Sequence, residues 1–469
     1  MEEGSARWAT DADLRHNGWF DTAGWPLGTI GGTRVYLPAL TQRQHTFVLA
    51  PPGAGKSRGI LVPALFSEGQ QPPAARRSLI VLDPAAELYR LTAPTLARTH
   101  HILCWNPARP TLSNTLFDPL GYLPPPDVDG FVSACEQAAA IWWTALGGGV
   151  RGGDPFWDRM PSNALKAIII ARACLQPGLT MQDVMAYMMP LSGAELKRDL
   201  EDSSHLVARL RGAVMAEILK SDKMEASVFS DLRERVLILA NTTVARVIGQ
   251  PSIRAQDFMD RPTMLYLHIG AESKALRPLF SVVLSTLVNQ LVGLSSGGRV
   301  LPRDVRVVID ELANIGRLYD LADSLATMRK YGIGFLMATQ TRALLTNVYG
   351  PDMATGIIDT CGTLVALGGQ AFEDGAWLSR NLGAREWVEE RTTRRYGLGA
   401  TKVPLLPTLE GKMSAASIFY PKVRSRTERE RRHAPLIAPH QLRGLPHNLV
   451  VVPTRMPPVL CALELYTGG

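Results

Sequence analysis

The sequence predicts an α/β nucleotide-binding domain that is interrupted by an all-helical segment. Ala-Pro-Pro-Gly-Ala-Gly-Lys-Ser at 50–57 directly follows the apolar run 46–49, as a glycine turn follows a buried strand. Apolar strands and helices alternate over 78–105 and again over 263–367, at a spacing typical of parallel crossovers. Between them, residues 126–262 have helical periodicities only.

The expected elements follow in chain order. Expected strands lie at 46–49, 78–83, 101–105, 263–269, 305–309, 334–338, 364–367, 449–452 and 459–465. Expected helices of the helical segment lie at 131–146, 158–175, 181–188, 193–202, 205–220 and 227–239. Other expected helices lie at 11–15, after the glycine turn to about 67, at 86–99 and at 276–294. The Arg/Pro-rich stretch 391–440 is the least regular part of the chain.

Three consecutive prolines at 124–126 mark a change of composition. We therefore predict three parts along the chain. Residues 1–125 form the first part of the nucleotide-binding domain, 126–262 the all-alpha domain, and 263–469 the second part of the nucleotide-binding domain.

The glycine turn has the residues of a phosphate-binding loop. Its backbone N–H groups would cradle the β-phosphate, Lys56 would reach the β- and γ-phosphates, and Ser57 would hold Mg²⁺. Ala50 stands where the usual G-x-x-x-x-G-K-[ST] pattern has its first glycine. That glycine eases the turn from strand to loop but is not a phosphate ligand. A chance glycine turn is the alternative. The candidate nucleotide-binding residues are Pro52, Gly53, Ala54, Gly55, Lys56, Ser57 and Arg58.

Two carboxylates end the apolar strand at 305–309. A P-loop NTPase needs one acid for the Mg²⁺ shell and one for the attacking water. Asp310 suits the first role and Glu311 the second. Asp83, at the end of the strand that follows the loop helix, is a rival metal acid, but no glutamate adjoins it. The alternative explanation of the Asp310-Glu311 pair is an exposed helix start, because acidic residues are favoured there.

Two further polar residues lie near the same strands. Gln340 follows the strand 334–338 and could contact the γ-phosphate or the water, or it is an ordinary turn residue. Arg329 precedes that strand. An arginine can neutralise the γ-phosphate in cis or from a neighbouring subunit, but spacing alone makes Arg329 a solvated surface residue.

Composition indicates a globular chain, with 46% hydrophobic and 20% charged residues among 469. Its five cysteines have no C-x-x-C spacing, which predicts reduced thiols in a cytosolic protein without zinc or disulfides. The N-terminus does not resemble a signal peptide, and 278–294 is expected to be too short and too polar to span a membrane. Nearly all of the net charge of +7 lies between Arg385 and Arg432, where twelve basic residues oppose six acidic ones. This segment predicts a polyanionic partner or, alternatively, a solvated and partly disordered loop.

Several groups of residues, in order, also carry a likeness to a known family. They are 4–10, the loop with Gly59 and Pro63, Leu82-Asp83 with Glu87-Leu88, Asn106-Pro107 with 117–120, Phe156-Trp157-Asp158, 310–313 through 321–323, Arg329-Lys330, Gln340 and Tyr349-Gly350. With this order and spacing the chain resembles the coupling-protein ATPases of conjugation and type IV secretion, the TraD/TraG/TrwB family. Most members of that family begin with two transmembrane helices, and this sequence shows none before the loop. The chain is therefore expected to be either a shortened form or a member that naturally has no such anchor. It also has Pro84-Ala85-Ala86 where Lys-Gly is common.

The resemblance implies a RecA-like domain with an inserted all-alpha domain, which assembles as a hexameric ring around DNA and is expected to be a monomer in isolation. It implies ATP and Mg²⁺ as ligands, Asp310 on the metal, Glu311 as catalytic base, Gln340 as γ-phosphate sensor and Arg329 as a finger to the neighbouring subunit. Expected partners are DNA, the relaxase, and the channel ATPases and inner-membrane components of a type IV secretion system. The expected location is the cytoplasmic face of the inner membrane. A coupling ATPase for protein effectors, or a docking platform with little turnover, is the alternative.

Overall fold

The computed structural model describes residues 6–148, 155–218, 221–269, 273–295, 299–404, 415–445 and 447–467. Eleven strands form its main sheet. They are β1 (Trp25–Ile30), β2 (Thr33–Leu37), β3 (Thr46–Leu49), β4 (Ser78–Leu82), β5 (His101–Trp105), β6 (Thr263–Leu267), β7 (Val305–Ile309), β8 (Ile333–Thr339), β9 (Thr363–Leu367), β12 (Asn448–Pro453) and β13 (Val459–Ala462). Their order is β2-β1-β13-β12-β9-β3-β8-β7-β4-β6-β5.

The strands from β9 to β5 in this order run parallel, and β12, β13, β1 and β2 continue from β9 antiparallel. Every residue of β3, β4, β6, β7 and β8 is buried, as in parallel sheets with both faces covered. Neighbouring residues on β3 illustrate this: Phe47 packs into one hydrophobic cluster and Val48 into another. The sheet therefore separates two cores.

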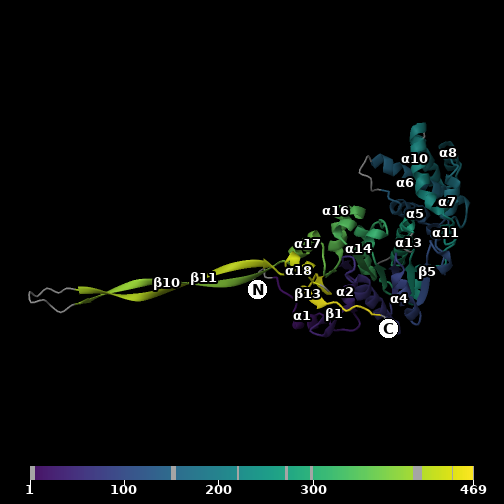
Figure 1. The fold of residues 1–469 in the computed structure, drawn as a ribbon. Helices are drawn as coiled ribbons and strands as arrows, with labels where there is room; N and C mark the ends of the chain where they lie inside the picture. The colour runs from purple at the N-terminus through teal and green to yellow at the C-terminus, as the bar shows by residue number, and fades with distance from the viewer. Residues whose placement is uncertain are drawn as a thin grey trace, which may run out of the picture.

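Helices cover both faces of this sheet (Figure 1). They are α1 (Asp11–His16), α2 (Ala39–Gln42), α3 (Val62–Gln70), α4 (Glu87–Leu96), α12 (Asp257–Asp260), α13 (Pro278–Leu294), α14 (Leu321–Met328), α15 (Arg342–Tyr349), α16 (Pro351–Thr360), α17 (Phe372–Leu382) and α18 (Pro439–Arg443). Among the described residues, 274–294 is the one helical stretch long and apolar enough to cross a membrane by length and composition. The expectation that 278–294 is too short and too polar to span a membrane was therefore wrong by these two criteria. The window is 67% buried inside the fold, as for a core helix.

The helices between Tyr122 and Arg246 gather at one end of the molecule (Figure 1). They are α5 (Phe131–Ala145), α6 (Pro155–Leu175), α7 (Met181–Met188), α8 (Gly193–Glu201), α9 (Leu206–Ile218), α10 (Asp222–Val236) and α11 (Thr242–Ala245). Helix α7 has the expected bounds, because Thr180 and Asp183 form a capping box at its start. The domain boundaries at 125 and 262 stay a prediction.

Two further expectations were wrong. The first 45 residues contain β1 and β2 at the antiparallel edge of the sheet, where only a short helix was expected. The stretch 391–440, expected to be irregular, contributes to a long antiparallel hairpin, β10 (Ala384–Pro404) and β11 (Ala415–Pro435). We call these two strands the arm, and it projects from the rest of the fold (Figure 1). Charged residues and glycines interrupt the alternation of apolar and polar residues that would have marked a half-buried strand.

Candidate nucleotide-binding site

The topology brings three polar strand ends to one edge of the sheet. Strand β8 lies between β3 and β7, and all three run parallel. The loop after β3, Gln340 after β8 and the acids after β7 therefore meet, although about 250 residues of sequence separate Lys56 from Asp310. Carboxyl ends of parallel strands are where α/β proteins bind ligands.

The loop has the backbone shape of a phosphate cradle. Gly53 and Gly55 have φ values of 76° and 90°, in the left-handed region that favours glycine. A Cβ at Gly53 would meet no atom within 4 Å, so the loop is open on that side. The helix begins with a π-helical turn at Ser57–Leu61 before α3. Pro63 explains this turn, because it has no N–H for the regular helical bond to residue 59.

Lys56 contacts both predicted acids. Its Nζ lies 3.3 Å from Asp310 Oδ1 and 3.4 Å from Glu311 Oε2, and it also donates to the Asp310 carbonyl. The Ser57 hydroxyl lies 3.5 Å from Asp310 Oδ1. One hydroxyl and one carboxylate oxygen are ligands that suit Mg²⁺, and a lysine beside them suits phosphates. These residues therefore fit a nucleotide with Mg²⁺.

Glu311 is held by the neighbouring strand. Its Oε1 accepts hydrogen bonds from the Thr339 hydroxyl at 2.8 Å and from the Gln340 backbone N–H at 3.3 Å. Burial raises the pKa of Glu311, while Lys56 and these hydrogen bonds oppose the rise. A buried, oriented carboxylate with a raised pKa can accept a proton from water.

Asp83, the rival metal acid, is fully buried and forms hydrogen bonds with the start of α4. Its carboxylate accepts the backbone N–H groups of Glu87 at 3.1 Å and Tyr89 at 2.8 Å. Burial raises the pKa of Asp83 to about 7. Just before α4, Ala86 has a φ of 57°, a left-handed conformation that glycine would adopt without strain. In the family that the sequence resembles, Lys-Gly is common at this position.

The remaining predicted residues lie in different places. Pro52 and Ala54 lie in the loop, with Pro52 exposed. The Arg58 guanidinium lies 3.7 Å from Glu87, and the Arg58 carbonyl accepts the Tyr466 N–H at 2.9 Å. Arg329 is exposed and precedes β8, so it lies beyond the opposite edge of the sheet from the loop. Within one chain, the structure does not bring Arg329 to Lys56.

Sequence reasoning gave no role to two residues at this edge. Thr339 orients Glu311, as described above. Gln370 follows β9, is buried, and its Nε2 donates to the carbonyls of Leu49 at 3.0 Å and Leu367 at 2.6 Å. Gln370 thus ties the strand before the loop to its neighbour. A polar residue just after an apolar parallel strand, the signal used for Gln340, would also have found Gln370.

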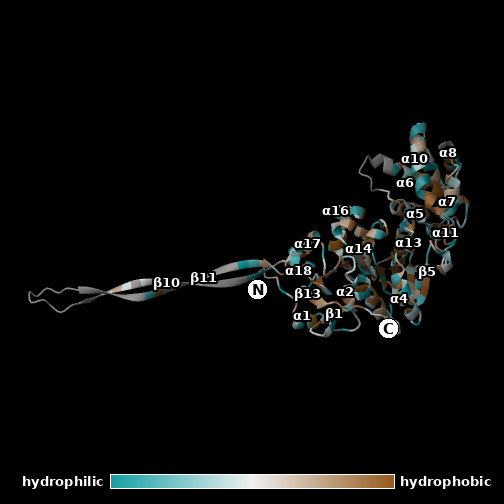
Figure 2. Ribbon diagram, in the orientation of Figure 1, coloured by the Kyte–Doolittle hydropathy of each residue, from teal (hydrophilic) through white to brown (hydrophobic). Residues whose placement is uncertain are grey.

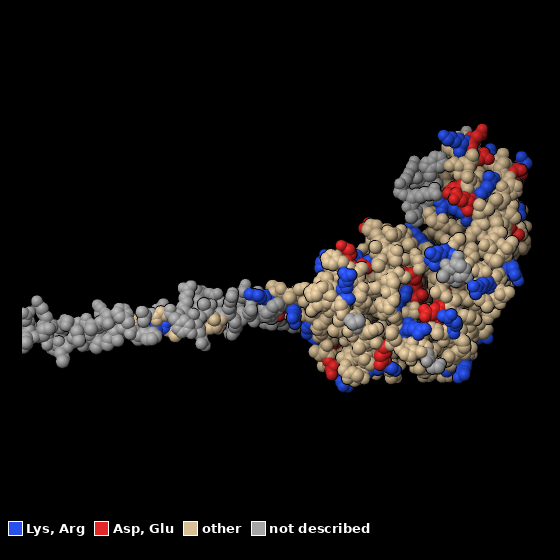
Figure 3. Space-filling view, viewed as in Figure 1, with Lys and Arg blue, Asp and Glu red and all other residues tan. Residues whose placement is uncertain are grey.

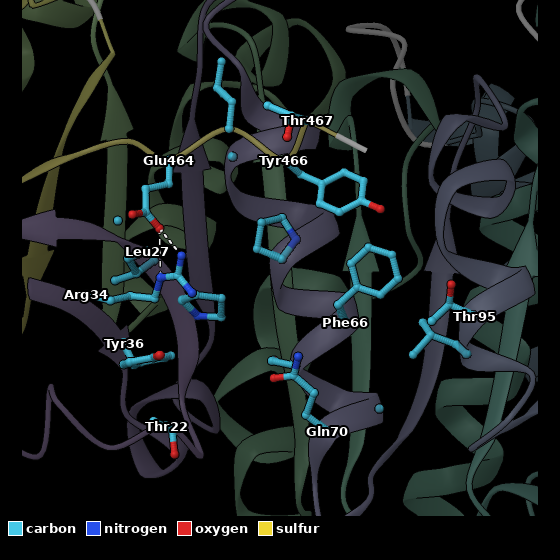
Figure 4. A pocket seen from close by; sticks show the side chains of 18 of the residues that line it. Thr22, Leu27, Arg34, Tyr36, Phe66, Gln70, Thr95, Glu464, Tyr466 and Thr467 are labelled. Atoms are coloured by element: carbon cyan, nitrogen blue, oxygen red, sulfur yellow. Dashed lines mark hydrogen bonds and ion pairs between the residues drawn. The ribbon is translucent and has the colours of Figure 1, made fainter. Parts of the chain in front are cut away.

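A cavity of about 560 Å³ lies against α3. In Figure 4, the rings of Phe66 and Tyr466 lie next to each other, with centroids 5.2 Å apart, and Arg34 forms an ion pair with Glu464. Neither Lys56 nor the two acids after β7 line this cavity. It is therefore separate from the candidate nucleotide site.

Comparisons with known proteins found a matching family model and several relatives. The model of the family described as "Type IV secretory system Conjugative DNA transfer" matches residues 7–466. Protein VirD4 of Agrobacterium fabrum is 24% identical in an alignment of 401 residues that covers 81% of this chain and 56% of VirD4. Conjugal transfer protein TraG of Escherichia coli is 24% identical over 440 residues, 83% of this chain and 66% of TraG. The chain thus spans less than two thirds of the length of these relatives.

Two solved structures show the same fold. The unbound form of bacterial conjugative coupling protein TrwBdeltaN70 has a TM-score of 0.72 and 16% identity, over 98% of this chain and 93% of that chain. Plasmid coupling protein TrwB in complex with ADP and Mg²⁺ has a TM-score of 0.71 and 17% identity, over 99% and 95%. The expected RecA-like α/β fold with a helical insertion is confirmed by this likeness.

Proposed function

Because the chain belongs to the family of conjugative DNA-transfer proteins of type IV secretory systems, we propose that it is an ATP-hydrolysing coupling protein. It would recruit DNA with its relaxase and drive this substrate to the secretion channel. The channel ATPases and inner-membrane components would be its further partners. Its working place would be the cytoplasmic face of the inner membrane.

The convergence of Lys56, Asp310 and Glu311 carries this proposal. Phosphoryl transfer needs a lysine on the phosphates, an acid on the metal and a second acid near the water. The distances of 3.3 and 3.4 Å from Lys56 to the two carboxylates support that division of roles. Relatives' structures with ADP and Mg²⁺ support the same ligands.

In the proposed reaction, Ser57 and Asp310 would hold Mg²⁺, and this ion would neutralise charge on the phosphates. Glu311 takes the proton of the attacking water, and Thr339 keeps its carboxylate in place. Gln340, whose backbone touches Glu311, senses the γ-phosphate. When the nucleotide binds, before these steps, Lys56 would exchange its contacts with the two acids for contacts with the phosphates.

Arg329 would act on the nucleotide of a neighbouring subunit. Its exposed position at the opposite edge of the sheet is compatible with an interface role and rules out contact within one chain. A finger supplied in trans makes turnover depend on assembly, by about 10³-fold or more. We therefore propose that the active form is a homo-hexameric ring and that the isolated chain is a weakly active monomer.

The test is steady-state ATP hydrolysis against protein concentration, with and without DNA. We expect turnover per chain to rise cooperatively with concentration and to be stimulated by DNA. Binding through phosphate contacts would weaken steeply with salt. Concentration-dependent hydrolysis without DNA stimulation would favour a coupling ATPase for protein effectors, and negligible hydrolysis under all conditions would favour a docking platform.

A further inference from the structure

Charge is divided sharply along the arm. The base half of the arm comprises 384–392 and 427–435, and the outer half comprises 393–404 and 415–426, as the strand register pairs them. The base half has five basic and five acidic residues, whereas the outer half has six basic residues and no acidic one. The basic residues of the outer half are Arg394, Arg395, Lys402, Lys422, Arg424 and Arg426. The excess positive charge predicted for this segment thus lies in the half farther from the main sheet.

The strand register places charged residues opposite each other in both halves. In the base half, Glu390 lies opposite Arg429, Arg391 opposite Glu428 and Glu389 opposite Glu430, so residues of both signs are present there. In the outer half, Arg395 pairs directly with Arg424. Like charges directly opposite each other are destabilising. The outer half contains no acidic residue, so a bound anion would supply the opposite charge at this level.

The arm is attached to the body at its base. The Ala6 N–H donates to the Ala384 carbonyl at 2.9 Å, and the Leu436 N–H donates to the Gly383 carbonyl at 2.9 Å. Figure 1 shows the two strands running together away from the body, and Figure 2 shows hydrophilic residues where they leave it. A two-stranded hairpin is marginally stable by itself in water, and each strand here has 21 residues. A binding partner would supply the missing stabilisation.

The composition of the outer half favours a nucleic acid as that partner. Tyr396, Phe419 and Tyr420 stand among its basic residues, and aromatic residues within a basic surface are typical of single-strand binding. On the face of the body seen in Figure 3, by contrast, acidic and basic side chains are interspersed. Twelve residues per strand span about 40 Å, long enough to follow a strand over several phosphates.

We propose that the outer half of the arm binds the phosphate backbone of a DNA strand, at a surface separate from the nucleotide site. This inference rests on the proposed function, which supplies DNA as the substrate. The arm would hold the transferred strand outside the part of the molecule that hydrolyses ATP.

The test compares three full-length variants for binding a labelled single-stranded oligonucleotide across a salt series. The first carries Arg→Gln at Arg394, Arg395, Arg424 and Arg426. The second carries Arg→Lys at the same positions, and the third carries Arg→Gln at Arg391 and Arg429 of the base half. For the first we expect an affinity loss of about tenfold or more and a salt dependence reduced by up to about 0.7 per lost phosphate contact. The other two should bind as the unchanged protein does.

Basal ATP hydrolysis and the thermal midpoint of the body should be equal in all variants, which shows that the fold is intact. Equal DNA affinity and equal salt dependence in the first variant would overturn the inference while leaving the proposed function standing. Loss of binding to phosphatidylserine vesicles, or of self-association, with DNA binding retained would overturn it too. If the unchanged protein neither binds DNA nor responds to it, the proposed function itself fails.

Discussion

The hydroxyl of Thr339 donates a hydrogen bond of 2.8 Å to Oε1 of Glu311, and so joins two adjacent parallel strands at the candidate site. The other carboxylate oxygen of Glu311 lies 3.4 Å from Lys56. The proposed base is therefore held from both sides, by a neutral donor that fixes its orientation and by a cation that stabilises its charge.

Replacing Thr339 by Val should lower kcat and move the acid limb of its pH profile upward. The hydrogen bond from Thr339 lowers the pKa of Glu311, so its loss raises that pKa further above the ordinary value. A base that is less well placed costs about 10- to 100-fold in rate. The measurement is kcat for ATP hydrolysis from pH 5 to 9.

Thr363→Val is the matched control, because the Thr363 hydroxyl is buried without a hydrogen-bond partner in the described structure. This variant should keep both kcat and the acid limb. An unchanged acid limb in Thr339→Val would show that Thr339 does not govern the protonation of Glu311.

Replacing Glu311 by Gln should abolish most turnover and spare binding. Loss of a general base costs about 10²- to 10⁴-fold in kcat, whereas Lys56, proposed for the phosphates, and Ser57, proposed for Mg²⁺, remain. Fluorescent nucleotide binding and ATP hydrolysis, measured on one preparation, separate the two effects. Lys56→Ala should instead weaken binding itself, and full turnover by Glu311→Gln would exclude Glu311 as the base.

Asp83 should make folding stability depend on pH. Its pKa is about 7 in the fold, against an ordinary value of 3.8, so the folded chain binds the extra proton between these values. Stability supplied by that proton is present below about pH 4 and is lost as pH rises through about 7. The stability advantage of the unchanged protein over Asp83→Asn should therefore shrink between pH 5 and 8 in urea unfolding. Asp352→Asn, at an exposed position, should differ by about 0.5 kcal/mol or less at both pH values.

Ala86→Gly should stabilise the protein. The φ of 57° at Ala86 costs a residue with a Cβ about 1–2 kcal/mol, which glycine avoids. Part of this gain is offset by the greater freedom of glycine in the unfolded chain, so we expect a net gain of about 0.5–1 kcal/mol. Thermal unfolding measures it. A loss of stability would show that residue 86 does not hold the left-handed conformation in solution.

Asp118 should attach the helical part to the sheet. Its two carboxylate oxygens accept the backbone N–H groups of Leu120 and of Met181, the first residue of α7, each at 2.9 Å. Asp118→Ala leaves two buried donors unpaired, at about 1–3 kcal/mol each. Amide exchange should quicken at Met181. Asp183→Ala weakens the cap of the same helix without breaking the bridge, and should cost about 1 kcal/mol.

Strands with continuous apolar runs were predictable from the sequence. Residues 46–49, 101–105 and 305–309 form strands with the expected bounds, because each is a short and mainly apolar run between polar or turn-forming residues. Strands β1 and β2 were missed, since glycine, proline and exposed residues interrupt their patterns. The arm was missed for a related reason: the pairing of its two strands, rather than an apolar face, satisfies its backbone.

The sequence by itself determined the chemistry available to this protein. The glycine loop with Lys56 and Ser57, and the Asp310-Glu311 pair, are local patterns whose residue types suffice to predict phosphate and Mg²⁺ ligands. Only the tertiary structure decided which of the distant groups meet. Strand order placed Asp310 beside Ser57, whereas Asp83 accepts backbone N–H groups from the first turn of α4 and Arg329 lies at the far edge. Side-chain partners across a sheet depend on strand order and register, which no local stretch of sequence specifies.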